Sequence, residues 1–365
     1  MDRQFIHRLA ESDTHPSQAN SSEALAQFAT FIPDASAQSE FLKTIHHDLA
    51  EEHTARERRV AGLVSSLSKK TIDRHGTALD YFVTGSTGTP VIFITALGQG
   101  LKYWHRLAEQ LVSGHRIIMW EPRGLFGYTA PFRLQDHVED LDAILRHEQI
   151  GACHLIGWCT GPKVSIEYYL LRPESILSMV FLNSTFKCDE QPDAHDTAYE
   201  HNLESLCRMV NSRPSLSGSV MKTLQSAGNS EPAIPLEEME GNTLAEHVLS
   251  LMSTHLKSHV IAPFQSEEST LNYVRQLLDF WSHDVTPLLP SVKAPVLLIS
   301  AEYDQIASPS GSSEAAGRFP NARHIQLAGG THYCLYDRPE WMANLMKAFF
   351  KESEESSAVA RTARG

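Results

Sequence analysis

The sequence predicts an α/β protein with a mostly parallel central sheet, helices on both faces, a helical cap insertion and an N-terminal helical extension. Two observations lead to this prediction. From about Thr77 onward, short apolar runs alternate with helix-like stretches, which is typical of a parallel α/β sheet. A Gly-x-Cys-x-Gly motif, Gly157 to Gly161, also stands between one apolar run and the next helix-like stretch. Glycines on both sides of its central residue indicate a sharp turn where strand and helix approach closely.

Seven strands are predicted in order along the chain. Several are continuous apolar runs, as expected for parallel strands that are buried on both faces. The predicted strands are residues 79–83, 91–94, 116–120, 153–156, 177–182, 296–300 and 324–327. Helix-like stretches separate them at residues 103–111, at 134–148 and from Cys159 to Leu171. This order of strand and helix favours a single parallel sheet.

Composition divides the chain into five parts. Residues 1–72 are polar, with apolar side chains at helical spacing, and predict two or three helices that form either a collar on the main domain or a docking surface for a partner. Residues 73–185 and 289–351 form the α/β core. Residues 186–288 lose the strand–helix rhythm and are too long for a simple connection, so they predict a helical cap. Residues 352–365 are charged and small, and predict a disordered tail.

Charge and composition limit the partners. The formal net charge is −13, which argues against nucleic acid and against an anionic membrane surface. No apolar run approaches the roughly 20 residues that span a bilayer, and the first residues lack the apolar core of a secretory signal. Five cysteines without paired spacing indicate reduced thiols in a cytoplasmic protein. His46, His47 and His53 lack the further ligands of a metal site, so no metal is predicted.

Three residues in the order Cys159, Asp304 and His332 predict nucleophilic catalysis. A cysteine attacks a carbonyl group as the thiolate, so it needs a base, and the base needs an acid that orients it. Asp304 follows the predicted strand 296–300 and His332 follows the strand 324–327, so both lie just past the carboxyl end of a strand. Asp304 remains open to the alternative of a turn residue, in which case Asp189, beyond the strand 177–182, is the first competing carboxylate.

Two backbone amides are candidates for holding the negative charge of a tetrahedral intermediate. One is the N–H of Thr160, directly after Cys159, and the other is the N–H of Leu97, in the loop that follows the strand 91–94. Trp158, beside Cys159, is expected to pack against its surroundings and to help shape an acyl pocket. It is therefore a candidate substrate-binding residue.

Five motifs in this order resemble the α/β-hydrolase superfamily from about Thr77 to Phe350. They are the loop Thr95-Ala96-Leu97-Gly98, the segment from Glu121 to Gly127, the motif around Cys159, and the Asp304 and His332 loops. The chain departs from the family where Thr95-Ala96 replaces the common His-Gly, where Glu121-Pro122 replaces Asp-x, and where cysteine replaces serine. The first two departures leave the backbone amides in place, whereas the third changes the chemistry.

Sulfur in place of oxygen favours transfer over hydrolysis, because an acyl group on Cys159 is a thioester of nearly the same energy as other biological thioesters. In this respect the chain resembles the aminoacyl- and acyl-shuttling transferases of nonribosomal peptide assembly lines. That resemblance implies acyl transfer between phosphopantetheine thiols of carrier proteins, or from a small-molecule thioester, in secondary-metabolite biosynthesis. It implies no bound cofactor beyond the phosphopantetheine of such a carrier.

Two other functions stay open. The first is a thioesterase or a lactone or ester hydrolase of the same fold, since cysteine also serves in dienelactone hydrolases. The second is a non-catalytic binding protein that kept the fold. The nature of the acyl group is not apparent from the sequence, because the cap sets the size of the pocket.

Overall fold

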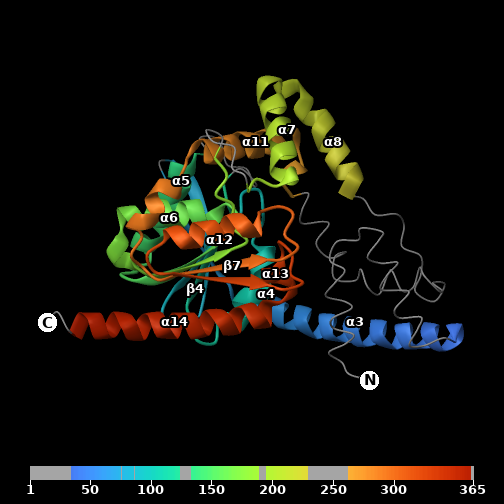
Figure 1. The fold of residues 1–365 in the computed structure, drawn as a ribbon, viewed down its shortest axis with the longest axis horizontal. Helices are drawn as coiled ribbons and strands as arrows, with labels where there is room; N and C mark the ends of the chain where they lie inside the picture. The colour runs from blue at the N-terminus through green and yellow to red at the C-terminus, as the bar shows by residue number, and fades with distance from the viewer. Residues whose placement is uncertain are drawn as a thin grey trace. The chain divides into compact units, whose positions relative to one another are not determined.

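An eight-stranded sheet with the order β1-β2-β4-β3-β5-β6-β7-β8 organises the protein (Figure 1). The computed structural model describes residues 34–74, 76–85, 87–123, 133–188, 195–228 and 262–362. The first two pairings, β1 with β2 and β2 with β4, are antiparallel, and the remaining pairs are parallel. The strands are β1 (Ser68–Arg74), β2 (Thr77–Thr84), β3 (Val91–Ile94), β4 (Ile117–Trp120), β5 (Cys153–Trp158), β6 (Ile176–Leu182), β7 (Val296–Ala301) and β8 (Ala322–Leu327).

The central strands are buried and consist mostly of apolar residues. Every residue of β3, β4, β5 and β7 is buried, as continuous apolar runs predict for parallel strands covered on both faces. Because strands β3 to β8 run in the same direction, their carboxyl ends lie along one edge of the sheet, and the loops that follow them meet there. The predicted α/β-hydrolase fold is thus confirmed.

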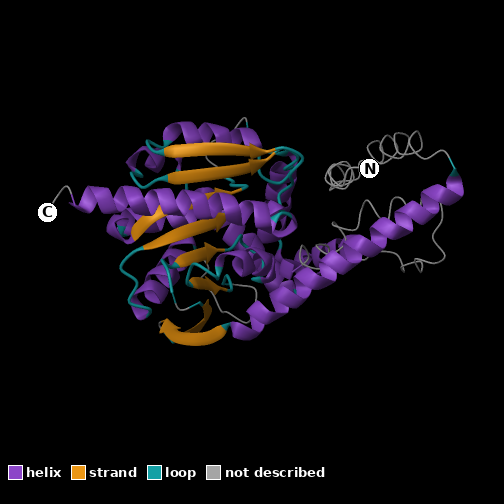
Figure 2. Ribbon diagram, turned by 90° about the horizontal axis from the view of Figure 1, so that it is seen from below, coloured by secondary structure: helices purple, strands orange, loops and turns teal. Residues whose placement is uncertain are grey.

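Helices cover both faces of the sheet. On one face of the sheet, α4 packs against α13 and α14 (Figure 1). On the other face, α5 packs against α6, and both α6 and α12 contact the turn η5 (Thr286–Ser291). Figure 2 shows α14 running across its face of the sheet. These helices are α4 (Lys102–Leu111), α5 (Leu134–His147), α6 (Gly161–Leu171), α12 (Pro309–Arg318), α13 (Cys334–Asp337) and α14 (Pro339–Thr362).

The predicted cap contains helices in the part that the structure describes. Helix α7 (Ala198–Ser212) packs against α11 (Glu267–Ser282), and α8 (Ser217–Gly228) follows α7 after the turn η2 (Pro214–Leu216). The short turns η1 (Pro173–Ser175) and η4 (Ala262–Phe264) precede β6 and α11, respectively. Residues 189–194 and 229–261 of the predicted cap lie outside the described residues.

Within the described residues, the N-terminal part forms one helix, α3 (Ala35–Ser66), which runs through 32 residues. Residues 1–33 lie outside the described residues, so the number of helices in the extension stays a prediction. The structure differs from the prediction at residues 68–72, which belong to the edge strand β1 and not to a helix. This strand is polar (Ser-Lys-Lys-Thr-Ile-Asp-Arg), as is common where charged side chains protect an exposed sheet edge. It therefore lacks the apolar run by which the other strands are found.

The predicted tail is also wrong in part, because α14 continues as a helix to Thr362. Its final segment contains Lys, Glu, Ala and Arg without Gly or Pro, and these residues favour a helix. By contact, the chain divides into two compact units. The described residues 34–62 and 224–228 belong to one unit, and the described residues from 63 to 223 and from 262 to 362 belong to the other. Within the described ranges, every helix is too short or too polar to span a membrane.

Candidate active site

Cys159 stands in a sharp turn between β5 and α6. Its backbone φ angle is +55°, a left-handed conformation that is uncommon for residues other than glycine. The two flanking glycines make this turn possible. A Cβ on Gly161 would lie 2.4 Å from the carbonyl oxygen of Ile94, and one on Gly157 would lie 2.8 Å from the backbone nitrogen of Pro162. The Gly-x-Cys-x-Gly pattern is therefore a steric requirement of the close strand–helix approach.

The loop after β6 also holds this turn. The Cys159 amide donates to the carbonyl oxygen of Leu182 at 3.0 Å, and the Cys159 carbonyl accepts from the amide of Thr185 at 3.0 Å. The Cys159 side chain is partly exposed, whereas the chain's other four cysteines are buried. Partial exposure at a turn with a strained φ angle is the environment expected for a reactive thiol rather than a core residue.

His332 and Asp304 meet at the same edge of the sheet. His332 lies in the loop after β8, Asp304 lies in the loop after β7, and Nδ1 of His332 is 2.8 Å from Oδ2 of Asp304. The other carboxylate oxygen of Asp304 accepts the backbone amides of Ile306 and Ala307, both at 2.9 Å. Both side chains are almost fully buried. The carboxylate is thus fixed by the backbone and in turn fixes the tautomer of the imidazole.

The other side of the His332 ring faces Cys159. Burial of the imidazole opposes its protonation, but the charges of Asp304 and Cys159, with the hydrogen bonds of both groups to the ring, outweigh burial. Together they raise the pKa of His332 to about 10. An imidazole that keeps its proton can pass it to a group bound at the neighbouring sulfur. The structure therefore brings the three predicted residues together in the order sulfur, imidazole and carboxylate.

Two side chains, those of Trp158 and Asn183, donate hydrogen bonds to the backbone of His332. Its carbonyl oxygen accepts from Nε1 of Trp158 at 3.2 Å and from Nδ2 of Asn183 at 2.7 Å. The same Asn183 nitrogen also reaches the carbonyl oxygen of Thr331, at 3.1 Å. Asn183 adopts a φ angle of +44°, which asparagine tolerates better than most residues. These contacts position the loop that carries the imidazole.

Trp158 packs against its surroundings, as predicted, but it has no surface for a substrate. It has 0% exposed surface, and its ring lies 5.4 Å from the ring of His332 and 4.9 Å from that of Tyr103. A side chain without accessible surface does not line an acyl pocket, so Trp158 supports the site from the core. Its position on β5 explains this, because every residue of this central strand is buried.

Asn183 was not found from the sequence. It directly follows the apolar run of β6, and a polar residue in that position at the carboxyl edge was the available signal. Asp189, the carboxylate in this loop that the sequence offers as an alternative to Asp304, lies outside the described residues.

The predicted oxyanion donors lie next to each other at this edge. The Leu97 amide, in the loop after β3, donates to the hydroxyl oxygen Oγ1 of Thr160 at 2.9 Å. Thr160 directly follows Cys159 and is the N-cap of α6. The next residue of the loop, Gly98, has a φ angle of +73°, and a Cβ there would lie 2.5 Å from the ring of Tyr273 on α11. The cap helix α11 thus packs directly on the loop after β3, Thr95-Ala96-Leu97-Gly98, which we call the oxyanion loop.

Tyrosines surround the sulfur. Burial raises the pKa of Tyr273 well above its usual value, and the neighbouring groups of Tyr199, Cys207 and Cys159 add to this effect. The pKa of Tyr333 is raised in the same way, first by burial and then by Tyr199 and Cys159. Because these tyrosines stay protonated, the surroundings of Cys159 offer neutral hydroxyl groups and aromatic rings.

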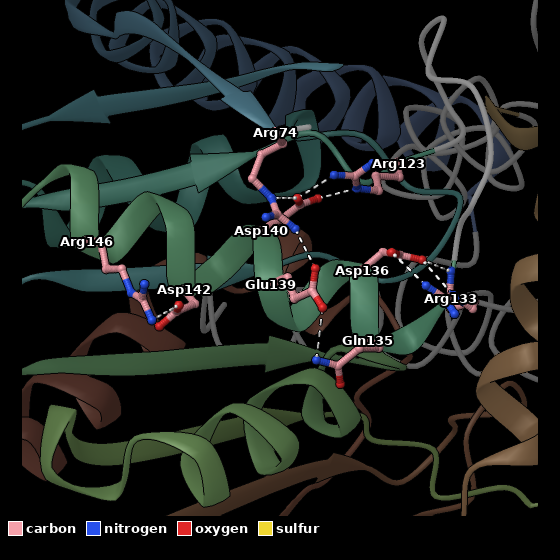
Figure 3. A network of polar contacts seen from close by, with 9 residues as sticks. All are labelled: Arg74, Arg123, Arg133, Gln135, Asp136, Glu139, Asp140, Asp142 and Arg146. Atoms are coloured by element: carbon pink, nitrogen blue, oxygen red, sulfur yellow. Dashed lines mark hydrogen bonds and ion pairs between the residues drawn. The ribbon is translucent and has the colours of Figure 1, made fainter. Parts of the chain in front are cut away.

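In its described residues, the loop after β4 has a structural role. Arg123 is buried and pairs through two nitrogens with Asp140, which also pairs with Arg74 at 3.1 Å (Figure 3). The carbonyl oxygen of Arg123 accepts from Nε2 of Gln276 on α11 at 2.8 Å. Arg123 therefore ties this loop to α5 and to the cap. Residues 124–127 of the predicted motif lie outside the described residues.

A family model described as "alpha/beta hydrolase fold" matches residues 89–339. A protein of Pantoea ananatis (strain LMG 20103), provisionally named carbamate hydrolase RutD, is 26% identical over 246 residues, or 66% of this chain and 81% of the relative. A protein of Mycobacterium tuberculosis (strain H37Rv), provisionally named non-heme bromoperoxidase BpoC, is 25% identical over 270 residues, or 72% of this chain and 94% of the relative. The crystal structure of MGS-M2, an α/β-hydrolase enzyme from a deep-sea metagenome library, covers 77% of this chain and 97% of its own, with a TM-score of 0.60 and 17% identity.

These comparisons overturn the predicted acyl transfer between thiols. The relatives are named for hydrolysis or for peroxidase chemistry, and the expectation of a transferase of assembly-line biosynthesis is wrong. It rested on the near-equal energy of two thioesters, which concerns the intermediate and does not determine whether water or a second thiol accepts the acyl group. The family resemblance, by contrast, is confirmed over more than half of the sequence. The chain belongs to the family of the alpha/beta hydrolase fold.

Proposed function

We propose that this protein is a hydrolase that cleaves ester, lactone or thioester substrates through an acyl group on Cys159. The observation that carries the proposal is the position of the His332 imidazole, bonded to Asp304 at 2.8 Å on one side and facing the Cys159 sulfur on the other. Membership of the family and the hydrolase name of the Pantoea relative support hydrolysis as the overall reaction.

Acylation begins with the Cys159 thiolate and the protonated His332. The sulfur attacks the substrate carbonyl carbon, a C–S bond forms, and the carbonyl oxygen becomes an oxyanion beside the Thr160 amide. When the oxyanion collapses, the bond to the leaving group breaks, and the leaving oxygen or sulfur takes the proton from Nε2 of His332. Asp304 holds Nδ1 of the ring throughout and stabilises its cation.

Deacylation uses the same groups in reverse. Water gives a proton to Nε2 of His332 and attacks the carbonyl carbon of the acyl group on Cys159. The C–S bond then breaks, which releases the carboxylic acid and restores the thiolate–imidazolium pair. All atoms and charges balance with water as the only co-reactant.

Peroxide chemistry, suggested by the name of the Mycobacterium relative, suits this site poorly. An accessible thiolate reacts with peroxide to give a sulfenic acid and then higher oxides, which removes the nucleophile. Cys159 is partly exposed, so peroxide could reach its sulfur. We therefore infer that water, rather than peroxide, is the co-substrate.

The proposed reaction needs neither a metal ion nor a redox cofactor, because thiolate, imidazole and backbone amides supply each step. The substrate is a small molecule or an acyl group presented on a carrier protein, and the net charge of −13 gives nucleic acid and anionic membranes no role. The five free cysteines fit a reducing compartment such as the cytoplasm.

The central test replaces Cys159 with alanine. Substitution C159A should lower hydrolysis of p-nitrophenyl acetate, of a γ-lactone, of a thioester and of an aryl carbamate by about 10⁴-fold or more for every substrate that the wild type cleaves. Mass spectrometry of the wild type, quenched during turnover, should find the acyl group on the peptide that contains Cys159. C159S should turn over more slowly than the wild type, because a hydroxyl is far less acidic than a thiol.

The matched control is C153A, which removes a fully buried thiol from β5, the strand that leads into the Cys159 turn. Its sulfur is 3.6 Å from the carbonyl oxygen of Ser175, away from His332, so C153A should keep wild-type turnover. Undiminished turnover in C159A, or an acyl group found on another residue, would show that Cys159 is not the nucleophile.

A further inference from the structure

The Leu97 amide, one of the two predicted oxyanion donors, is hydrogen-bonded to the side chain of Thr160. The Leu97 amide donates to Oγ1 of Thr160 at 2.9 Å, across 63 residues of sequence. Both residues are 5% exposed, so bulk water does not compete for this bond. The Leu97 N–H is therefore already engaged before a substrate carbonyl arrives.

Thr160 makes this bond instead of the one that its position favours. Threonine at an N-cap commonly accepts a backbone amide of its own helix through the side-chain oxygen. Thr160 is the N-cap of α6, with φ −81° and ψ −17°, and its side chain makes no capping bond. The hydroxyl crosses to the loop after β3. Its direction is thus set by the oxyanion loop and not by the helix.

A hydroxyl that accepts one hydrogen bond still has a hydrogen to donate. Since Thr160 is bonded to Cys159 through the backbone and its oxygen lies against Leu97, its O–H is close to where a carbonyl attacked by the sulfur must sit. Accepting the Leu97 N–H also polarises the O–H, because hydrogen bonds in a chain strengthen one another. Side-chain donors of this kind are effective in oxyanion sites.

We propose that the Thr160 hydroxyl donates a hydrogen bond directly to the oxyanion. The Leu97 N–H, which donates to Thr160 Oγ1, polarises this hydroxyl and so strengthens its bond to the oxyanion. The inference rests on the proposed function, since it requires a tetrahedral intermediate on Cys159. In this arrangement the oxyanion is held by two groups of one residue, the N–H and the O–H of Thr160. The Leu97 amide acts through the hydroxyl and not on the substrate itself.

The experiment compares two reactions of the same sulfur. Acylation by p-nitrophenyl acetate passes through an oxyanion, whereas alkylation by iodoacetamide is a displacement at a saturated carbon and forms none. In T160V, which keeps the shape of the side chain but removes the hydroxyl, the acylation rate constant should fall by about 10²-fold. The alkylation rate constant should change by less than about twofold, because the sulfur, His332 and Asp304 are untouched.

Two further variants complete the test. T160S keeps the O–H and should acylate within a few-fold of the wild type. T84V removes a buried hydroxyl that bonds to Oγ of Ser66 at 2.9 Å at the end of β2, and it should leave both rates unchanged. It controls for the general effect of losing a buried threonine hydroxyl. Thermal melting of each variant gives the accompanying loss of stability.

The outcomes separate this inference from the proposed function. If the wild type acylates and T160V acylates equally fast, the hydroxyl is not a donor and the inference fails alone. Faster acylation in T160V also overturns it, because the hydroxyl would then block the oxyanion site by keeping the Leu97 amide hydrogen-bonded to itself. An equal loss of the acylation and alkylation rates would also overturn it, because the hydroxyl would then affect the reactivity of the Cys159 sulfur and not the oxyanion. A wild type that is alkylated but never acylated would overturn the proposed function, and the inference with it.

Discussion

Among single residues, His332 is held both through its ring and through its backbone. Asp304 fixes Nδ1 of its ring, and Trp158 and Asn183 both donate to its backbone carbonyl. A ring held through its backbone and through one nitrogen has a single orientation toward Cys159. Because the charge of Asp304 is a main reason that the pKa of His332 is raised to about 10, this carboxylate also determines the pH range of the imidazolium.

The pH dependence of D304N tests this assignment. A pKa raised to about 10 means that His332 keeps its proton below that pH and loses it above, so hydrolysis of an alkyl ester by the wild type should decline above about pH 10. In D304N the alkaline decline should move to lower pH, and kcat should fall by as much as about 10⁴-fold. The measurement is a profile of kcat/KM against pH for both proteins. An alkaline limb at the same pH in both would rule out Asp304 as the partner that raises the pKa.

At the level of elements, one lysine joins the helix after the active-site turn to the cap. Nζ of Lys163, on α6, donates to the carbonyl oxygens of Lys187 at 2.8 Å, Phe280 at 2.6 Å and His283 at 2.7 Å. Two of these carbonyls lie at the C-terminal end of α11, where the helix dipole favours a positive charge. Since Tyr273 of α11 packs on Gly98, this tie also determines where the cap meets the oxyanion loop.

Substitution K163M should therefore affect both stability and activity. It removes a donor from two buried carbonyl groups and from the part-buried carbonyl of His283, which should lower the free energy of unfolding by about 3 kcal/mol. Below the melting transition, kcat should also fall as α11 shifts on the oxyanion loop. Urea unfolding and steady-state kinetics measure the two effects. K293M is the control, because Lys293 is exposed and its side-chain nitrogen bonds to the Pro290 carbonyl, and it should cost less than about 0.5 kcal/mol.

Across the whole molecule, the C-terminal helix and the sheet are joined through a buried histidine. His154 on β5 bonds to Ser178 at 2.8 Å and to Glu354 of α14 at 3.3 Å, and it stacks on Phe350 at 4.2 Å. Burial lowers the pKa of His154 to about 4, while Glu354 acts against burial and nearby His115 acts with it. The folded protein thus holds this imidazole neutral in a range where the unfolded chain protonates it.

Acid should weaken the fold through this group. Between about pH 6.5 and pH 4 the unfolded chain binds more protons at His154 than the folded protein does, so stability rises with pH across this range and is lost on acidification. The slope contributed by one group is at most about 1.4 kcal/mol per pH unit. Urea unfolding at several pH values should show a smaller acid loss in H154Q than in the wild type. Parallel curves for the two proteins between pH 6.5 and 4 would contradict this role.

The sequence by itself determined the fold and which three candidate residues meet at the carboxyl edge of the sheet. Apolar runs such as residues 91–94 specify parallel strands because only a strand covered on both faces buries every side chain. The glycines around Cys159 specify the turn because a Cβ at either position would meet the backbone. The order of Cys159, Asp304 and His332 then places all three at one edge, since each follows a strand of the same direction.

Only the tertiary structure decided how these groups are held and what lies around them. The polar edge strand β1 lacks an apolar run, and it forms because it pairs with β2. The bond from Leu97 to Thr160, the clamp of Trp158 and Asn183 on His332, and the tie of Lys163 to α11 join residues far apart along the chain. No local pattern encodes such contacts, because each exists only when two elements already lie side by side. A sequence can thus specify which side chains reach an edge of a sheet, whereas the direction of each hydrogen bond there is fixed by packing.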